Sequence, residues 1–196
     1  MKERAFTIIE LLVVIGILLI LMSLLFPALF AHLEGARIRE GENRLQALQA
    51  ALQRYQGQFG DYPPSSPAPG SGDNVENVGN EKMLACLLTT RGGGPFLTAD
   101  IIAPWLADTD EDGQKEVTDP WGNPWIYFHH QDYVDYPAGY QGERVYYRIK
   151  GTPFEAESAT RKPRVFRNPG AYQLWGCGPN QTNEAGQGDD IGNVKQ

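Results

Sequence analysis

Oxygen donors suited to a metal ion are concentrated in residues 108–119, which read DTDEDGQKEVTD. Acidic residues occupy the first, third, fifth and twelfth places, and a glycine occupies the sixth. With this spacing a calcium loop turns alternate side chains onto one ion, because glycine permits the sharp turn. The predicted ligands are Asp108, Asp110, Asp112, Asp119 and the carbonyl of Gln114, with Glu116 acting through water. The alternative is an acidic turn exposed to solvent.

Two adjacent histidines, His129 and His130, lie close in sequence to Asp132 and Asp135 and suggest a second metal site. Neighbouring residues of a strand point to opposite faces. Shared ligation of one ion is therefore not expected, and surface positions are predicted for both rings.

The two cysteines, Cys86 and Cys177, are too few for a disulfide framework and too far apart for a CxxC metal site. They can form one disulfide in an oxidising compartment. The alternative is a buried free thiol.

Glu10 is a carboxylate inside an apolar run, residues 6–26, whose other strongly polar side chains are Thr7 and Ser23. At ~1.5 Å per residue this run is roughly 31 Å long as a helix, which is enough to cross a bilayer. Ionisable groups inside a membrane are rare, so Glu10 is predicted to be functional. The alternative is a side chain that reaches the lipid headgroups.

Basic residues set the expected orientation of this segment. Lys2 and Arg4 precede it, and no further Lys or Arg occurs before Arg37. Because Lys and Arg residues beside a membrane span are retained on the cytoplasmic side, the first residues are expected in the cytoplasm and the rest of the chain beyond the membrane. A secretory signal peptide, with a small-residue cleavage site near Ala28 and Ala31, is the alternative.

The composition limits the class of protein. A chain of 196 residues can form one moderate domain with an appendage. A net charge of -7 and a pI near 5.0 argue against nucleic acid as a partner. No P-loop, HExxH, nucleophile elbow or dinucleotide motif is present in the sequence, so an enzyme is not expected.

The periodicity predicts an α+β fold. A continuous helix is expected over residues 6–58, and apolar positions that follow Pro27 form one helical stripe for docking on a globular domain: Ile38, Leu45, Leu48, Leu52, Tyr55 and Phe59. Residues 65–80 are predicted to be an exposed loop, followed by short helices at 81–90 and 101–106. Residues 125–128, 145–149 and 171–175 are expected to form one small antiparallel sheet over the stripe.

The N-terminal sequence AFTIIELL, which begins at Ala5, resembles the cleavage and methylation motif of type IV pilins and type II secretion pseudopilins. Ala5 stands where those proteins usually have glycine. The resemblance implies that a prepilin peptidase cuts between Ala5 and Phe6, that the new amine of Phe6 is methylated, and that the apolar segment is kept. It also implies that Glu10 neutralises the N-terminal amine of a neighbouring subunit.

Two later segments resemble the major pseudopilin of type II secretion more specifically. They are DPWGNPW at residues 119–125 and the stretch YQLWGCGPNQTNEAGQGDDIGNV at 172–194. In that family the C-terminal loop binds one Ca²⁺. The resemblance implies Asp189 and Asp190 as ligands, with Asn180 where an aspartate is expected.

The resemblance implies a division into a leader (1–5), a transmembrane half-helix (6–29), an amphipathic half-helix (30–60), a variable region (61–118) and a β-sheet head with the C-terminal loop (119–196). It also implies a subunit of a helical filament, anchored in the inner membrane with its head in the periplasm, that drives protein secretion across the outer membrane. The implied partners are other copies of the chain, prepilin peptidase, minor pseudopilins, the secretion platform and the bilayer. Alternatives are a type IV pilin for adhesion, motility or DNA uptake, and a membrane-tethered binding protein or enzyme.

Overall fold

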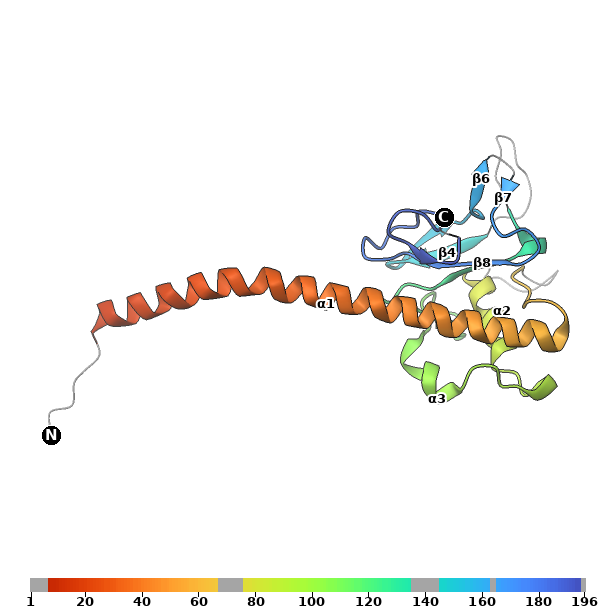
Figure 1. The fold of residues 1–196 in the computed structure, drawn as a ribbon, viewed down its shortest axis with the longest axis horizontal. Coiled ribbons are helices and arrows are strands. Elements are labelled where there is room, and N and C mark those ends of the chain that lie inside the picture. Colours follow the sequence, from red (N-terminus) through yellow and green to blue (C-terminus); the bar gives the residue numbers. More distant parts are fainter. Residues whose placement is uncertain (1–6, 67–75, 135–144, 163–164, 195–196) are drawn as a thin grey trace. The chain divides into compact units, whose positions relative to one another are not determined.

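A computed structural model describes residues 7–66, 76–134, 145–162 and 165–194 (Figure 1). The chain divides into two compact units, Met1–Arg37 and Ile38–Gln196. The fold is α+β, with one long helix and several small antiparallel sheets, as the sequence predicts.

The long helix α1 spans Ile8–Phe59 and contains Pro27. The helix predicted over residues 6–58 is therefore confirmed from Ile8 onwards; Thr7 precedes the helix, and Phe6 lies outside the described residues. Among the described residues, α1 is the one helix long and apolar enough to cross a membrane. Its large apolar side chains between Ile8 and Phe26 are exposed, as a lipid-facing segment requires.

In the second unit, the predicted stripe of α1 forms one side of the core. Leu48, Ala51 and Leu52 are fully buried, and Ile38, Leu45 and Tyr55 pack partly buried against the same cluster. The short helix α2, Val78–Leu87, contributes Met83, Leu84 and Leu87 to that core. Figure 1 shows α2 alongside the C-terminal part of α1.

The region after α2 is built from single turns. It contains η1 (Arg91–Gly93), α3 (Ala99–Ile102) and η2 (Ala103–Trp105). The helix predicted at 101–106 is thus shorter and begins earlier, because Leu106 already belongs to strand β1. Strand β1, Leu106–Ala107, pairs with β2, Glu116–Val117.

The central sheet has the order β3-β8-β9, with β3 at Ile126–His129, β8 at Tyr172–Gly176 and β9 at Ile191–Gly192. All pairs are antiparallel, and Ile126 lies opposite Trp175. Alternate residues face opposite layers. Tyr127 and Leu174 join the core with α1, whereas Phe128 joins a second core that includes Tyr147. Burial on both faces explains the nearly continuous apolar character of β3 and β8.

The prediction that residues 145–149 belong to this same sheet is wrong. Strand β4, Tyr146–Ile149, instead pairs with β5, Thr152–Glu155. The hydroxyl of Tyr147 accepts from the backbone N of Tyr127 at 3.1 Å and donates to its carbonyl at 2.9 Å. The Tyr147 side chain thereby satisfies the backbone groups of Tyr127 at the edge of β3, to which a neighbouring strand would otherwise have to pair. A further hairpin joins β6, Thr160–Lys162, to β7, Val165–Phe166.

Asn80 connects α2 to the start of the sheet. Its side chain is fully buried, and its amide donates to the carbonyls of Val117 at 2.9 Å and Trp125 at 2.7 Å. Its oxygen accepts from the backbone N of Val117 at 2.8 Å. One side chain therefore satisfies three backbone groups.

We expect Asn80→Ala to lower the free energy of unfolding by about 3 kcal/mol or more, because a buried polar group left unsatisfied costs about 1–3 kcal/mol. Urea unfolding of the detergent-solubilised full chain, followed by tryptophan fluorescence, measures the change. Gln53→Ala, at an exposed position of α1, is the control and should stay within about 0.5 kcal/mol of the parent. Equal effects of both substitutions would contradict this role of Asn80.

Candidate functional site

Glu10 lies in the first turn of α1 and forms a capping box with Thr7. The Thr7 hydroxyl accepts from the backbone N of Glu10 at 3.3 Å, and Oε2 of Glu10 accepts from the Thr7 backbone N at 2.9 Å and from its hydroxyl at 2.7 Å. This reciprocal arrangement satisfies helix N-terminal donors. The T-x-x-E spacing signals it in sequence, but our sequence analysis missed it. Ala5 and Phe6, the predicted cleavage site, lie outside the described residues.

A first cluster of carboxylates, here called the α2–β2 acidic group, consists of Glu81, Asp110, Asp112 and Glu116. One carboxylate oxygen from each residue lies within 4.8 Å of the others. Asp110 and Asp112 belong to the predicted calcium loop, and Glu116 was expected to act through water. Glu81 comes from α2 and was missed, since no local spacing connects it with the loop.

The other predicted ligands of the loop are not part of this group. Asp108 closes a turn, in which its carboxylate accepts from the backbone N of Asp112 at 3.2 Å and of Gly113 at 3.0 Å. Gln114 donates to the Asp112 carboxylate through its backbone N at 2.7 Å and its side chain at 3.1 Å. Strand β2 then carries the chain away in an extended conformation before residue 119 is reached.

Asp119 organises the following turn. Its Oδ1 accepts from the backbone N of Trp121 and of Asn123, both at 2.9 Å. Burial raises the pKa of this carboxyl to about 6, against the opposing effect of these hydrogen bonds. The structure therefore places Asp119 in the DPWGNPW turn rather than with the loop acids.

A second cluster, the C-terminal acidic group, consists of Glu184, Asp189 and Asp190, with one oxygen of each within 4.8 Å of the others. Asp190 is fully buried, and its Oδ2 accepts from the backbone N of Glu184 at 2.9 Å and of Gly186 at 2.8 Å. Burial raises its pKa to about 6. Within the residues that the structure describes, Oδ1 of Asp189 and Oδ1 of Asp190 are buried without a hydrogen-bond partner.

The predicted residues of the C-terminal loop are thus brought together in part. Asp189 and Asp190 meet, and Glu184, which our sequence analysis passed over, joins them. Asn180 instead supports the loop: its backbone N donates to Asp189 Oδ2 at 2.9 Å, and its side-chain oxygen accepts from the backbone N of Thr182 at 2.6 Å.

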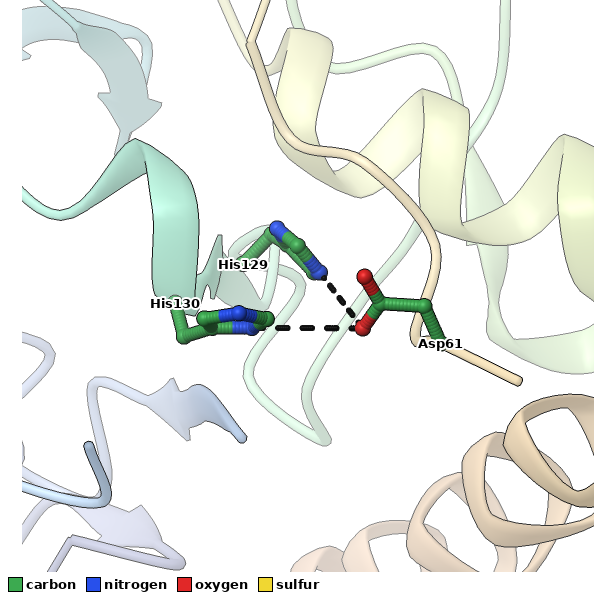
Figure 2. Close-up of side chains that lie close together, drawn as sticks. All are labelled: Asp61, His129 and His130. Atoms are coloured by element: carbon green, nitrogen blue, oxygen red, sulfur yellow. Dashed lines mark hydrogen bonds and ion pairs between the residues drawn. The ribbon is translucent and has the colours of Figure 1, made fainter. Parts of the chain in front are cut away.

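His129 and His130 both approach one carboxylate, which corrects the expectation that they point apart. Oδ1 of Asp61 lies 3.1 Å from Nε2 of His129 and 3.9 Å from Nδ1 of His130. Figure 2 shows both rings turned towards this carboxylate. The two ring centroids are 4.2 Å apart. Strand alternation stops here because β3 ends at His129 and the turn η3, His130–Asp132, begins.

The hydrogen bonds around His129 favour a structural role over metal ligation. Nδ1 of His129 accepts from the backbone N of Gln131 at 3.3 Å, so in the neutral ring the proton is on Nε2 and is donated to Asp61. A metal at Nε2 would require that nitrogen without its proton. This hydrogen bond is the main reason why the pKa of Asp61 is lowered.

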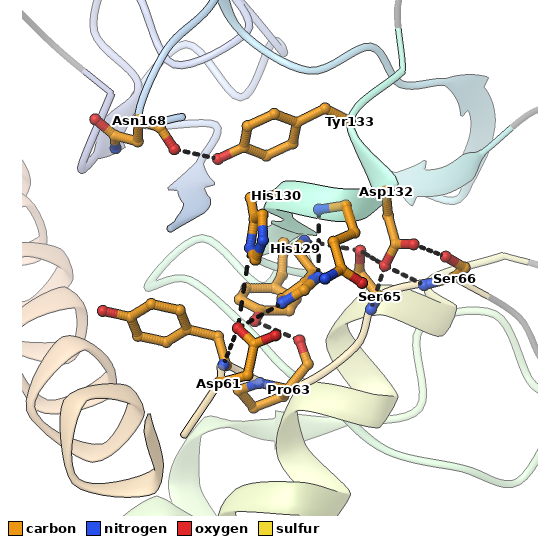
Figure 3. A network of polar contacts seen from close by, with 12 residues as sticks. Asp61, Pro63, Ser65, Ser66, His129, His130, Asp132, Tyr133 and Asn168 are labelled. Atoms are coloured by element: carbon orange, nitrogen blue, oxygen red, sulfur yellow. Dashed lines mark hydrogen bonds and ion pairs between the residues drawn. The ribbon is translucent and has the colours of Figure 1, made fainter. Parts of the chain in front are cut away.

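Further hydrogen bonds from the same turn tether the chain segment that follows α1. Figure 3 shows the carboxylate of Asp132 beside Ser65 and Ser66. This carboxylate accepts from the backbone N of Ser65 at 2.9 Å, from the backbone N of Ser66 at 3.0 Å, and from both hydroxyls. The Ser65 hydroxyl in turn accepts from the backbone N of His129 at 2.8 Å. Asp132 is therefore occupied by this tether, and Asp135 lies outside the described residues.

Both cysteines are free thiols in the structure, so the Cys86–Cys177 disulfide is not formed. Cys177 is buried in the second core, where burial raises the pKa of its thiol. Cys86 is half-buried on α2.

Comparison with known proteins adds two findings. Residues 1–26 match the prokaryotic N-terminal methylation motif. The chain is also similar to the type II secretion system core protein G of Escherichia coli (strain K12), with 28% identity over 147 residues that cover 72% of this chain and 85% of the relative. A comparison with solved structures found no match.

We expect Asp61→Asn to lower the free energy of unfolding at pH 7 by about 0.5 kcal/mol, because solvent weakens a hydrogen bond whose acceptor carboxylate is half exposed. Since the pKa of Asp61 is lowered on folding, its contribution is complete above 3.8 and is lost as the pH falls through the lower folded value. Urea unfolding of variant and parent at pH 7, and again at a pH below the folded pKa of Asp61, measures this difference in stability. Asp100→Asn, which removes an exposed carboxylate from α3, is the control; a deficit that persists at low pH would refute the assignment.

Proposed function

Because the chain is a pseudopilin-like protein that carries a prokaryotic N-terminal methylation motif, we propose that it is a structural subunit of a type II secretion pseudopilus. The observation that carries the proposal is the length of the similarity to the type II secretion core protein, 147 residues, which extends far beyond the 26 residues of the motif. The motif alone suits a type IV pilin equally well. The DPWGNPW turn around Asp119 and the C-terminal acidic group favour the pseudopilin.

In this proposal a prepilin peptidase cuts between Ala5 and Phe6, and the amine of Phe6 is methylated. The apolar part of α1 stays in the inner membrane, and the head faces the periplasm. Copies of the chain then assemble, with minor pseudopilins and the secretion platform, into a filament that moves folded proteins towards the outer-membrane channel. The role is structural rather than catalytic.

Glu10 would set the register of this assembly. Both hydrogen bonds from Thr7 end on Oε2 of Glu10, which leaves Oε1 for the Phe6 amine of a neighbouring subunit. A carboxylate in an apolar layer is strongly favoured to find such a cation. The helix cap therefore holds the carboxylate at the membrane end of α1 without consuming its capacity to pair.

The C-terminal acidic group would bind one Ca²⁺ that holds the loop closed. The residues present fit the ion, since three carboxylates converge and two buried oxygens lack hydrogen-bond partners in the described part of the chain. All are oxygen donors, as Ca²⁺ prefers. Asp189, Asp190 and Glu184 are the proposed side-chain ligands.

We expect Glu10→Gln to reduce assembled filaments and secretion by about tenfold or more, which corresponds to about 1.4 kcal/mol of lost pairing energy. The variant keeps an acceptor for Thr7 and loses only the charge. Sheared filaments and released cargo are measured in a host that lacks its own core protein G. Glu34→Gln, on the same helix, is the control. Normal assembly by the Glu10 variant, or an intact Ala5–Phe6 bond by mass spectrometry, would contradict the proposal.

We expect Ca²⁺ to raise the melting temperature of the detergent-solubilised chain, since a ligand at one hundred times its Kd stabilises a protein by about 2.7 kcal/mol. Asp189→Asn combined with Asp190→Asn should reduce this increment, because the ion at the C-terminal acidic group loses two charged ligands while the amide oxygens still accept the loop hydrogen bonds. Melting with CaCl₂ or with EGTA measures the effect. Glu157→Gln, at an exposed position, should leave it unchanged; a full response in the double variant would argue against this calcium site.

A further inference from the structure

The α2–β2 acidic group joins three separate parts of the second unit, Ile38–Gln196. Glu81 comes from α2, Asp110 and Asp112 come from the loop, and Glu116 comes from β2. Their oxygens lie within 4.8 Å of one another. We propose that this group is a second divalent cation site, of the Ca²⁺ class, independent of the C-terminal acidic group.

Two members of the group are buried and aimed into it with an unsatisfied oxygen. Glu81 is 7% exposed and Glu116 is fully buried. In the described part of the chain, Oε1 of each has no hydrogen-bond partner, whereas Oε2 of Glu116 accepts from the backbone N of Thr109 at 2.6 Å. Removing a carboxylate from water without a partner is strongly unfavourable. The arrangement therefore calls for a counter-charge beside these carboxylates.

The surrounding charges are of the wrong sign to supply it. Among the residues that the structure describes, neither Glu81 nor Glu116 forms an ion pair with a lysine or arginine. Burial, followed by the negative charges of Asp112, Asp110, Glu116 and Asp108, raises the pKa of Glu81 to about 8. A bound cation would relieve both the burial and the repulsion.

The donor set selects the class of ion. Every side-chain donor in the group is a carboxylate oxygen, without nitrogen or sulfur, which suits hard cations and disfavours Zn²⁺ or Cu²⁺. Because two donors lie on a loop, the ligand cage can adjust to the larger, irregular coordination of Ca²⁺, whereas Mg²⁺ demands a strict octahedron.

The ion would fasten the β1–β2 hairpin to α2. Asn80, the neighbour of Glu81, already holds Val117, the neighbour of Glu116, by two hydrogen bonds. These bonds fix the two glutamates opposite each other before any ion arrives. Such preorganisation lowers the entropic cost of binding.

The test uses the full chain in detergent micelles with Asp189→Asn and Asp190→Asn, so that the C-terminal acidic group is removed. After chelation, calorimetric titration with CaCl₂ should show one bound ion. Adding Glu81→Gln should weaken its affinity at least ~tenfold, because a buried charged ligand is lost. Glu111→Gln is the matched control: it removes the same charge from an exposed position in the same loop and should bind as the parent does.

Absence of calcium binding in this background would overturn the proposal, as would equal affinities of the Glu81 and Glu111 variants. Asp112→Asn, at an exposed member of the group, is a second test in which unfolding is not expected, and it should weaken binding in the same direction. Melting with EGTA should show that both variants remain folded. Because filament assembly is not measured here, failure of this site leaves the proposed secretion role unaffected.

Discussion

The structure of the second unit, Ile38–Gln196, depends on the packing of one stripe of α1 against one face of the central sheet. Leu48 and Leu52 are fully buried there, with Leu174 of β8 in the same core. A sheet of three short strands cannot leave its other face in water when that face carries Phe128 and Trp175. A second layer is therefore needed, and β4 with β5 supplies it. The hydroxyl of Tyr147 then replaces a neighbouring strand at the edge of β3.

The same compact core buries carboxylates that water would otherwise hydrate. Helix α2 must turn Met83 and Leu87 inward, and this brings Glu81 down against β2. The C-terminal loop must close over the edge of β8, and this buries Asp190. Backbone N–H groups satisfy one oxygen of Asp190 and one of Glu116. The remaining oxygens are the reason why cations are proposed as partners for both acidic groups.

Sequence patterns predicted the features that depend on local periodicity and missed those that depend on tertiary contacts. The stripe of α1 follows from apolar spacings of three, four and seven residues, and the strands around Tyr127 and Leu174 follow from short aromatic or β-branched runs bounded by Gly, Pro or Asn. The partner of β4 could not be read in this way, because a side chain at the edge of β3 decides it. Likewise the calcium-loop spacing identified Asp110 and Asp112 as members of the α2–β2 acidic group. Glu81 is remote in sequence, and the packing of α2 brings it into the group. The orientation of His129 and His130 was mispredicted because β3 ends at His129, so strand alternation does not reach His130.

The N-terminal turn shows how one short sequence can serve the free and the assembled chain in the proposed function. In the free chain, Oε2 of Glu10 accepts from the backbone N–H and the hydroxyl of Thr7, so one oxygen of its carboxylate is satisfied at the start of α1. Cleavage after Ala5 would create a cationic amine on the residue that precedes Thr7. In the proposed function that amine would be next to the positive end of its own helix, where the macrodipole disfavours a second positive charge. A glutamate from a neighbouring helix would relieve this repulsion, so cleavage would make each subunit both donor and acceptor of the contact that adds the next one.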